Sequence, residues 1–377
     1  NLGLEGKQIT GNLPDELVRR LDALGAASFV NDKYNFPEYK PVGGRPLTRK
    51  VAFNPEVMKI IYRQMLEEAG VKCLFYTHAC EALTEGREIR ALLVSMIEGA
   101  ALIEADIFID CTGDAKICAL ADPASVIKYD DEFTMHKSMF FYVGQVTPFD
   151  PEYNRELYKH LYMEGKIPGN VWDRFGFMLQ LDPGICQIAV CYAAGDGVSS
   201  DDMTRMDGVL RENVFKIIDF LHEYMPGFEN CRLIQNSIQV GVRAGQGIRG
   251  LDSVTDETIF GGDRHDIIAQ LNRSIGAHQN KEAAAFSSPW SRSEKGTGSL
   301  PMGALIPIGL DNVLAAGRAV SSEPHLIGTF RMMPTCMTSG EAAGLMAYIS
   351  KREGKKVCKV TYNELRPLLD ENGFILE

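Results

Sequence analysis

The sequence predicts an α/β fold with more than one domain. Amphipathic helical segments alternate with short apolar strands in the first third of the chain, and the same texture returns after residue 300. An apolar run at 107–109 stops abruptly at Asp110-Cys111-Thr112-Gly113-Asp114. A buried strand that ends at a glycine turn is where α/β folds place their ligand contacts. The length of 377 residues suits two or three domains of roughly 100–200 residues each.

The first third supplies the elements in regular order. Asn54 followed by Pro55 is typical of a helix start, with Asn as the N-cap and Pro in the first turn. Glycine closes both expected helices, as it commonly does at a helix C-terminus. In order, we expect a helix at 14–24, a helix at 54–70, a strand at 71–77, a hairpin of strands 89–97 and 101–105, and a buried strand at 107–109.

The middle of the chain has a different texture, with more aromatic and loop residues between 123 and 299. We interpret this stretch as a second domain inserted into the first. The expected elements of the middle and last parts are a helix at 206–223, a strand at 237–242, a strand at 313–316, a helix of small residues from 334, and a short amphipathic helix at 361–373.

A single Gly-x-Gly-x-x-Gly pattern occurs at 245–250. A dinucleotide-binding loop of this pattern needs a strand before it and a helix after it. The residues that follow are short and acidic, and their carboxylates would repel a pyrophosphate. We therefore do not interpret this pattern as a nucleotide fingerprint.

Charge and cysteine content exclude several classes of protein. With 39 Lys+Arg against 50 Asp+Glu, the net charge is −11, which argues against a nucleic-acid partner. No apolar run approaches the roughly 20 residues of a membrane span. Nine scattered cysteines form no Cys-x-x-Cys pair, so we expect reduced thiols in a cytoplasmic protein and no metal site.

The most informative stretch is 310–350. Its expected strand runs into Gly317-Arg318, and Arg331 precedes a helix that begins at Pro334. A helix N-terminus carries about half a positive charge and favours an anion or a polarised carbonyl. An ordinary strand–helix unit also explains the glycines and prolines here, but it does not explain an arginine just before the helix. Pro334 lacks an N–H, so we expect the donors to be those of 335–337.

Several motifs resemble the FAD-dependent oxidoreductase family, of the glutathione-reductase-like flavoprotein group. The most specific is Arg331-Met332-Met333-Pro334-Thr335-Cys336-Met337, which follows Ala315-Ala316-Gly317-Arg318. Asp110-Cys111-Thr112-Gly113-Asp114 is similar to the family's "D-A-T-G-D" turn, and Gly241-Val242-Arg243 is similar to part of its insert. The resemblance covers nearly the whole chain.

The resemblance implies a glutathione-reductase-like FAD-binding fold with an inserted α+β substrate domain. The FAD-binding domain would comprise 1–122 and 300–353, the inserted domain 123–299, and a helical tail 354–377. The family's first strand, glycine-rich turn and acidic ribose ligand have no counterpart in the given residues, so we expect the fold to be incomplete at its N-terminus. The resemblance implies FAD as the cofactor and leaves open whether this fragment holds it.

The resemblance also implies cofactor contacts along FAD. Ala79 and Cys80 would lie at the adenine, Thr112-Gly113 near the adenosine half, and Gly317-Arg318 near the ribityl–pyrophosphate segment. The helix start at 335–337 would face the pyrimidine end of the isoalloxazine. The full expected set is Ala79, Cys80, Thr112, Gly113, Asp114, Gly317, Arg318, Gly328, Arg331, Pro334, Thr335, Cys336 and Met337.

Four residues are candidates for catalysis. His278 and His325 could bind substrate or transfer a proton, since an imidazole titrates near pH 6.5, and a capping or surface role is the alternative for each. Arg243 and Arg331 could bind a carboxylate substrate bidentately, or pair with an Asp. The family's usual histidine before Gly328 is replaced by Pro324.

The resulting hypothesis is an FAD-dependent dehydrogenase or reductase. Its small organic substrate would lie over the isoalloxazine at the domain boundary, with an unidentified electron donor or acceptor. Two alternatives remain open, a flavin-free relative that acts as a binding protein and a flavin monooxygenase or halogenase on the same scaffold.

Overall fold

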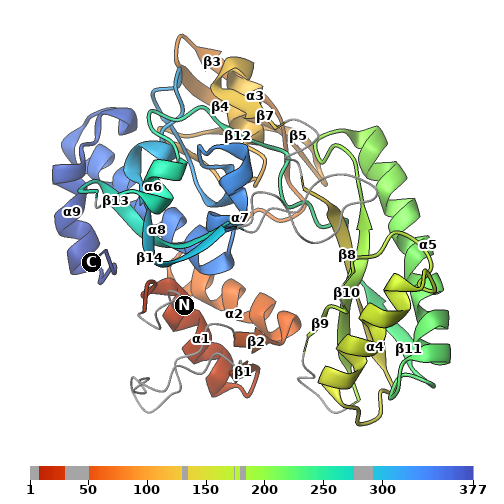
Figure 1. Cartoon of the computed structure of the whole chain (residues 1–377). Coiled ribbons are helices and arrows are strands. Elements are labelled where there is room, and N and C mark those ends of the chain that lie inside the picture. The colour runs from red at the N-terminus through yellow and green to blue at the C-terminus, as the bar shows by residue number, and fades with distance from the viewer. Residues whose placement is uncertain are drawn as a thin grey trace. The chain divides into compact units, whose positions relative to one another are not determined.

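The computed structural model describes residues 8–29, 51–129, 135–173, 175–178, 184–262, 264–275 and 292–376. The chain divides into two units (Figure 1). Unit 1 comprises Asn1–Lys128, Gln246–Gly276 and Arg292–Glu377, and unit 2 comprises Tyr129–Gly245 and Ala277–Ser291.

The N-terminal part of unit 1 is a pair of helices and a short strand pair. Asn54 caps α2 as expected, because its side chain accepts hydrogen bonds from the N–H groups of Glu56 and Val57. Leu17 and Leu21 pack against Met58 and Ile61 in a buried cluster between the two helices. The elements are α1 (Leu13–Ala23), β1 (Ala27–Phe29), β2 (Val51–Phe53) and α2 (Pro55–Glu68), with β1 and β2 antiparallel.

A three-stranded antiparallel sheet follows, made of β3 (His78–Glu85), β4 (Glu88–Met96) and β5 (Gly99–Glu104). The expected hairpin is β4–β5 and is confirmed. The expected strand at 71–77 is wrong, since the strand starts at His78. Tyr76 has a φ of 55°, a left-handed conformation that interrupts an extended chain.

The segments that carry the sequence motifs meet in a parallel strand pair. β6 (Phe108–Asp110) and β15 (Val313–Ala315) lie side by side, with Ala315 opposite Asp110, so both strands end at the same edge. Asn312 holds the other end, donating to the carbonyls of Ile89 and Asp106 and accepting from the N–H of Ile89. The two motif-bearing turns therefore leave the pair together.

The remaining elements of unit 1 surround this pair. The helix of small residues, α8, begins at Met333 and runs to Glu353, as expected, and α7 and α8 both pack on β13. In Figure 1, α8, β13 and β14 group together in unit 1. The elements are α3 (Lys116–Ala121), β7 (Val126–Lys128), β12 (Gln246–Ile248), α6 (Asp256–Phe260), β13 (Ile267–Ile275), β14 (Arg292–Pro301), α7 (Ile327–Phe330) and α9 (Tyr362–Glu371).

The Gly-x-Gly-x-x-Gly pattern at 245–250 is largely strand. β12 begins at Gln246 and pairs antiparallel with β7. A phosphate-binding loop leads from a strand into a helix, and β12 does not have this form. The observed strand agrees with the interpretation that this pattern is not a nucleotide-binding loop.

In the described residues of unit 2, a four-stranded sheet in the order β11-β8-β10-β9 packs with the helices α4 and α5. Apolar residues of β8 and β10 and one face of α5 form a buried core. The elements are β8 (Lys137–Gly144), α4 (Pro151–Met163), β9 (Phe177–Met178), β10 (Cys186–Ala193), α5 (Ser200–Tyr224) and β11 (Arg232–Asn236).

Two expected boundaries in unit 2 are wrong. The helix expected at 206–223 starts at Ser200, because Ser199 caps it and two aspartates in its first turn favour its N-terminus. No strand forms at 237–242, where one was expected: β11 lies just before this range and ends at Asn236, and only an isolated bridge between Gly241 and Ser138 falls within it. At Ser237 the hydroxyl as well as the backbone N–H bonds the carbonyl of Phe140, which ends the regular ladder. Among the helices that the structure describes, none is long and apolar enough to cross a membrane.

Candidate functional site

The turn after β6 is built on Asp110, whose side chain is fully buried. Oδ1 of Asp110 accepts the N–H of Thr112 at 3.0 Å and its hydroxyl at 2.6 Å, and Oδ2 accepts the N–H of Cys118 at 3.0 Å. The Thr112 hydroxyl also accepts the N–H of Lys116, at the start of α3. Asp110 and Thr112 therefore hold the turn in shape, and the Thr112 hydroxyl is occupied within the protein.

Arg318 and Asp114 connect the two turns. The guanidinium of Arg318 donates two hydrogen bonds to the Asp114 carboxylate, at 2.6 and 2.7 Å, in a bidentate arrangement. Gly113 has a φ of 88°, and a Cβ there would lie 2.8 Å from Nε of Arg318. Only glycine lets the guanidinium lie this close to the turn. Gln246 fixes the turn from β12, since its side-chain amide donates to the Asp114 carbonyl at 2.6 Å.

Ser339 joins the turn after β15 to α8. Its hydroxyl accepts the N–H of Gly317 at 2.8 Å and donates to the carbonyl of Cys336 at 2.8 Å. Gly317 has a φ of 74°, a left-handed conformation that favours glycine. The turn is thus held against the first turns of α8. The sequence predicts Ser339 only as one of the small residues of the helix that starts at 334, and its hydrogen-bonding role was missed. The available signal was its spacing, since a residue three positions after Cys336 lies on the same face of a helix.

The donors at the start of α8 differ from those expected. The N–H of Cys336 bonds the carbonyl of Met332 at 2.9 Å, so Cys336 and Met337 lie within the regular helical ladder. Because the helix begins at Met333, its first-turn N–H groups without an intrahelical acceptor are those of Met333 and Thr335, with Pro334 between them. The expectation that Cys336 and Met337 offer their N–H groups is therefore wrong.

Arg331 stands immediately before this helix start. It is half-buried, and its Nε atom is enclosed with no hydrogen-bond partner among the described residues. Burial, assisted by the charge of Arg318, lowers the pKa of the Arg331 guanidinium to about 10. A buried guanidinium N–H without an acceptor costs about 1–3 kcal/mol, so this position favours a negatively charged or carbonyl-bearing group.

The thiol of Cys336 is not activated. Burial raises its pKa to about 11, although the charges of Arg318 and Arg331 act in the opposite direction. Its Sγ lies 3.7 Å from the carbonyl of Phe330. A neutral thiol at physiological pH is a poor nucleophile, which agrees with a structural role for this side chain.

The other expected cofactor contacts lie apart from this turn. Half-buried Ala79 and exposed Cys80 are on β3, where Ala79 pairs with Val94 and the Cys80 thiol donates to the His78 carbonyl. α3 packs on β3 and so connects this strand with the turn after β6. Gly328 is buried within α7.

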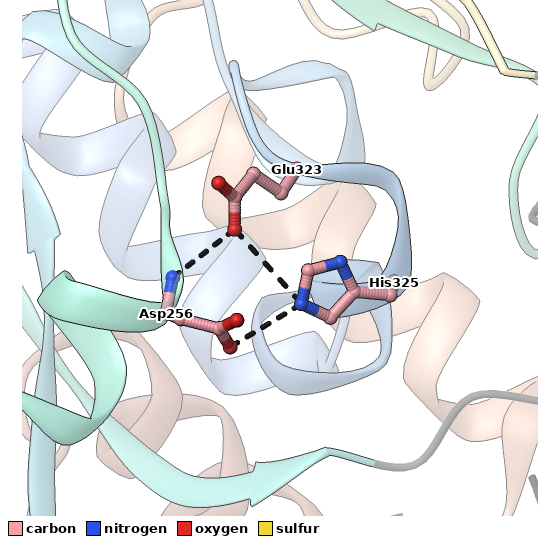
Figure 2. Close-up of side chains that lie close together, drawn as sticks. All are labelled: Asp256, Glu323 and His325. Atoms are coloured by element: carbon pink, nitrogen blue, oxygen red, sulfur yellow. Dashed lines mark hydrogen bonds and ion pairs between the residues drawn. The ribbon is translucent and has the colours of Figure 1, made fainter. Parts of the chain in front are cut away.

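Neither of the two histidine candidates is among the residues that form the turns after β6 and β15 or the start of α8. His325 lies beside Asp256 and Glu323, and its Nε2 is 3.2 Å from Oδ1 of Asp256 (Figure 2). Asp256 and Glu323 are functional candidates that sequence reasoning missed, since nothing local links two residues this far apart. His278 lies outside the described residues.

Arg243 belongs to unit 2. It donates to the carbonyl of His136 at 2.8 Å, and its guanidinium lies 5.0 Å from the ring centroid of Trp172. Tyr192 stacks on both aromatic neighbours, with centroids 4.1 Å from His136 and 6.3 Å from Trp172. These contacts fix Arg243 by a cation–π interaction and a backbone hydrogen bond.

A family model described as FAD dependent oxidoreductase matches residues 2–369. A comparison with curated proteins finds no match.

Three solved structures illustrate the structural likeness. A geranylgeranyl bacteriochlorophyll reductase-like protein from Thermoplasma acidophilum is 12% identical, with a TM-score of 0.47, over 88% of this chain and 65% of its own. A myxobacterial chondrochloren halogenase is 10% identical, with a TM-score of 0.45, over 98% of this chain and 70% of its own. An aromatic hydroxylase from angucycline biosynthesis is 10% identical, with a TM-score of 0.44, over 98% of this chain and 58% of its own. The chain thus spans somewhat less than two thirds of the first of these structures, and likeness at this level assigns it no reaction.

Proposed function

This chain belongs to the family of FAD-dependent oxidoreductases, and from this premise we propose that it oxidises or reduces a small organic molecule at a flavin held by the turns after β6 and β15 and by the first turn of α8. The observation that carries the proposal is the enclosed Nε of Arg331, which has no hydrogen-bond partner among the described residues. It precedes the first-turn N–H groups of Met333 and Thr335, which have no acceptor within the helix. These groups suit the N1–C2=O edge of an isoalloxazine, where negative charge collects on reduction.

The residues present fit this cofactor in two further respects. Gly113 and Gly317 both have positive φ, so each of the two turns at the common edge of β6 and β15 has one position without a side chain. Arg318 is already neutralised by Asp114. We therefore assign Arg318 and Asp114 to shaping the turns, and Arg331 to contacting the cofactor or a substrate carboxylate.

FAD supplies the electron-transfer chemistry when it is bound. The chain's own part is to hold the ring edge, to offer positive charge there and to keep the neighbouring thiol of Cys336 neutral. We propose that the substrate is a small organic molecule that meets the ring. Whether the reaction is a dehydrogenation, a reduction or a monooxygenation is decided by testing the reconstituted protein with NADH, NADPH and dioxygen.

The decisive comparison is between Arg331→Met and Arg352→Met, a control at the opposite end of α8 where Arg352 is exposed and pairs with Glu353. Removing a half-buried positive charge near the ring is expected to cost the reduced flavin about 1–3 kcal/mol. For a two-electron couple this lowers the midpoint potential by roughly 20–60 mV.

Spectroelectrochemical titration of the FAD-reconstituted protein measures this shift. We expect Arg331→Met to have a more negative potential and to retain less flavin, while Arg352→Met matches the parent. Equal potentials in all three proteins would refute the assigned role of Arg331. A parent protein that binds no FAD would refute the flavin site itself and favour the binding-protein alternative.

A further inference from the structure

Three metal-ligating side chains converge outside the proposed flavin site. Asp256 begins α6, while Glu323 and His325 flank Pro324 in the segment before α7. Figure 2 shows Nε2 of His325 facing both carboxylates. Nε2 lies 3.2 Å from Oδ1 of Asp256 and 3.9 Å from Oε2 of Glu323, and one donor atom from each residue lies within 4.8 Å of the other two.

The backbone holds the two segments together before any side chain is considered. Val254 and Ser322 form a parallel bridge. The N–H of Val254 donates to the Ser321 carbonyl at 3.0 Å, and the N–H of Glu323 donates to the Val254 carbonyl at 2.9 Å. Pro324 restricts the backbone between the two ligating residues. The cluster therefore rests on a fixed frame and not on two loops that meet by chance.

Separate contacts orient the side chains. Oε2 of Glu323 accepts the N–H of Asp256 at 3.1 Å, so this carboxylate is anchored to the segment that carries its neighbour. The His325 side chain is only 13% exposed, against 44% for Glu323 and 55% for Asp256. The imidazole is thus the enclosed base of the cluster, and the carboxylates form its open rim.

The donor separations suit a small divalent ion. Zinc–nitrogen and zinc–oxygen bonds are about 2.0–2.2 Å long, so two ligands of a tetrahedral ion lie roughly 3.3–3.5 Å apart. The two measured separations, 3.2 and 3.9 Å, bracket this distance. Two carboxylates and a neutral imidazole carry a charge of −2, which a divalent ion neutralises. One nitrogen and two oxygen donors favour a transition ion over Mg²⁺ or Ca²⁺, which prefer oxygen alone.

We propose that Asp256, Glu323 and His325 bind one divalent transition-metal ion of the zinc type, with water completing its coordination. Bound there, the ion ties the start of α6 to the segment that leads into α7. This gives His325 a role different from the substrate or proton-transfer role expected from the sequence. The site is independent of the proposed flavin site.

The test uses Co²⁺ and Zn²⁺ on chelator-treated protein. Because the chain has nine cysteines, Co²⁺ distinguishes the proposed site from thiol binding, since thiolate ligands give an intense charge-transfer band in the near ultraviolet. We expect one Co²⁺ per chain with visible ligand-field bands and without that charge-transfer band. Zn²⁺ should displace it and raise the thermal midpoint, whereas Mg²⁺ and Ca²⁺ at the same concentration should do neither.

Three single variants and one control locate the ion. Asp256→Asn, Glu323→Gln and His325→Gln should each weaken Zn²⁺ binding at least tenfold and remove the thermal shift. The control is His160→Gln, which alters the exposed His160–Glu164 pair of α4 and should bind as the parent does. Far-ultraviolet circular dichroism establishes that each variant is folded.

Either of two results would overturn the proposal. In the first, the parent protein fails to bind Co²⁺ or Zn²⁺ in the micromolar range, which would mean that the three residues contact only one another. Otherwise, binding would persist unchanged in folded His325→Gln and Asp256→Asn, which would place the ion elsewhere. A chain that binds Zn²⁺ here but not FAD would leave this proposal standing.

Discussion

Glu341 of α8 is expected to make the stability of the protein depend on pH near neutrality. It accepts a hydrogen bond from the backbone N–H of Leu13, the first residue of α1, while its Oε2 is buried without a hydrogen-bond partner in the described part of the chain. Burial raises the pKa of this carboxyl to about 7, and the nearby Glu16 adds to the rise. Asn12, the N-cap of α1, makes no side-chain cap bond, so Glu341 serves α1 in its place.

The sign of the effect follows from the direction of the pKa change. The unfolded chain releases this proton near pH 4.5 and the folded chain near pH 7, so the folded state binds more protons between these values. The free energy of unfolding therefore falls as the pH rises through this window and levels off above it. A rise from 4.5 to about 7 corresponds to roughly 3 kcal/mol, and partial exposure of the side chain to solvent reduces the expected effect to about 1–2 kcal/mol.

Glu341→Gln tests this directly, because the amide keeps an acceptor for the Leu13 N–H and cannot ionise. Urea unfolding at intervals from pH 5 to pH 8 should show the variant equal to the parent at pH 5 and about 1–2 kcal/mol more stable at pH 8. Glu364→Gln is the control, since hydrogen bonds from Lys355 and Thr361 lower the pKa of Glu364 to about 2. Its difference from the parent should stay constant over the same range. A Glu341→Gln difference that is flat with pH would refute the reasoning.

Two further predictions concern the turn after β6. Asp110→Asn should lower the free energy of unfolding, measured in urea titrations, by about 1–3 kcal/mol. The amide NH₂ of the variant would face a backbone N–H, of Thr112 or Cys118, that now donates to the buried carboxylate. An unchanged unfolding midpoint would contradict the role given to this carboxylate. Gly113→Ala should cost about 2–4 kcal/mol in the same assay, because it adds a clash with Arg318 to the cost of a positive φ. Gly86→Ala has a similar φ of 61° with nothing within 4 Å of its Cβ, so it should cost only about 1 kcal/mol, and equal losses at the two glycines would contradict the clash.

Local chemistry made much of the fold predictable. The cap at Asn54, the β4–β5 hairpin and the strands that became β6 and β15 each follow from side chains within one turn or one strand length of each other. The same holds for α8, whose start near Pro334 is set by the fixed φ of proline. Hydrophobic periodicity and capping act over a few residues, which is the range that a single sequence displays.

The pairings between distant segments could not be predicted in this way. Arg318 and Asp114 are 204 positions apart, and only the parallel register of β6 with β15 brings their turns together. The expected strand at 71–77 failed for a related reason. An apolar run becomes a strand only where a partner accepts its backbone hydrogen bonds, and the left-handed Tyr76 turns the chain before His78 begins that pairing.

Arg318, in the turn after β15, and Arg331, just before α8, differ in a way that decides what this site can hold. Asp114 takes up the charge of Arg318, while no described carboxylate pairs with Arg331. The site therefore presents about one unbalanced positive charge together with the two N–H groups of the helix start that have no acceptor within the helix. The charge of Arg318 already helps to lower the pKa of Arg331. If Arg318 had no carboxylate partner, the repulsion between the two guanidinium groups would be stronger and would oppose the burial of Arg331. By pairing with Arg318, Asp114 leaves the guanidinium of Arg331 as the one unbalanced positive charge of this site. A single positive charge suits a group such as the isoalloxazine ring, which is neutral when oxidised and gains one negative charge when reduced.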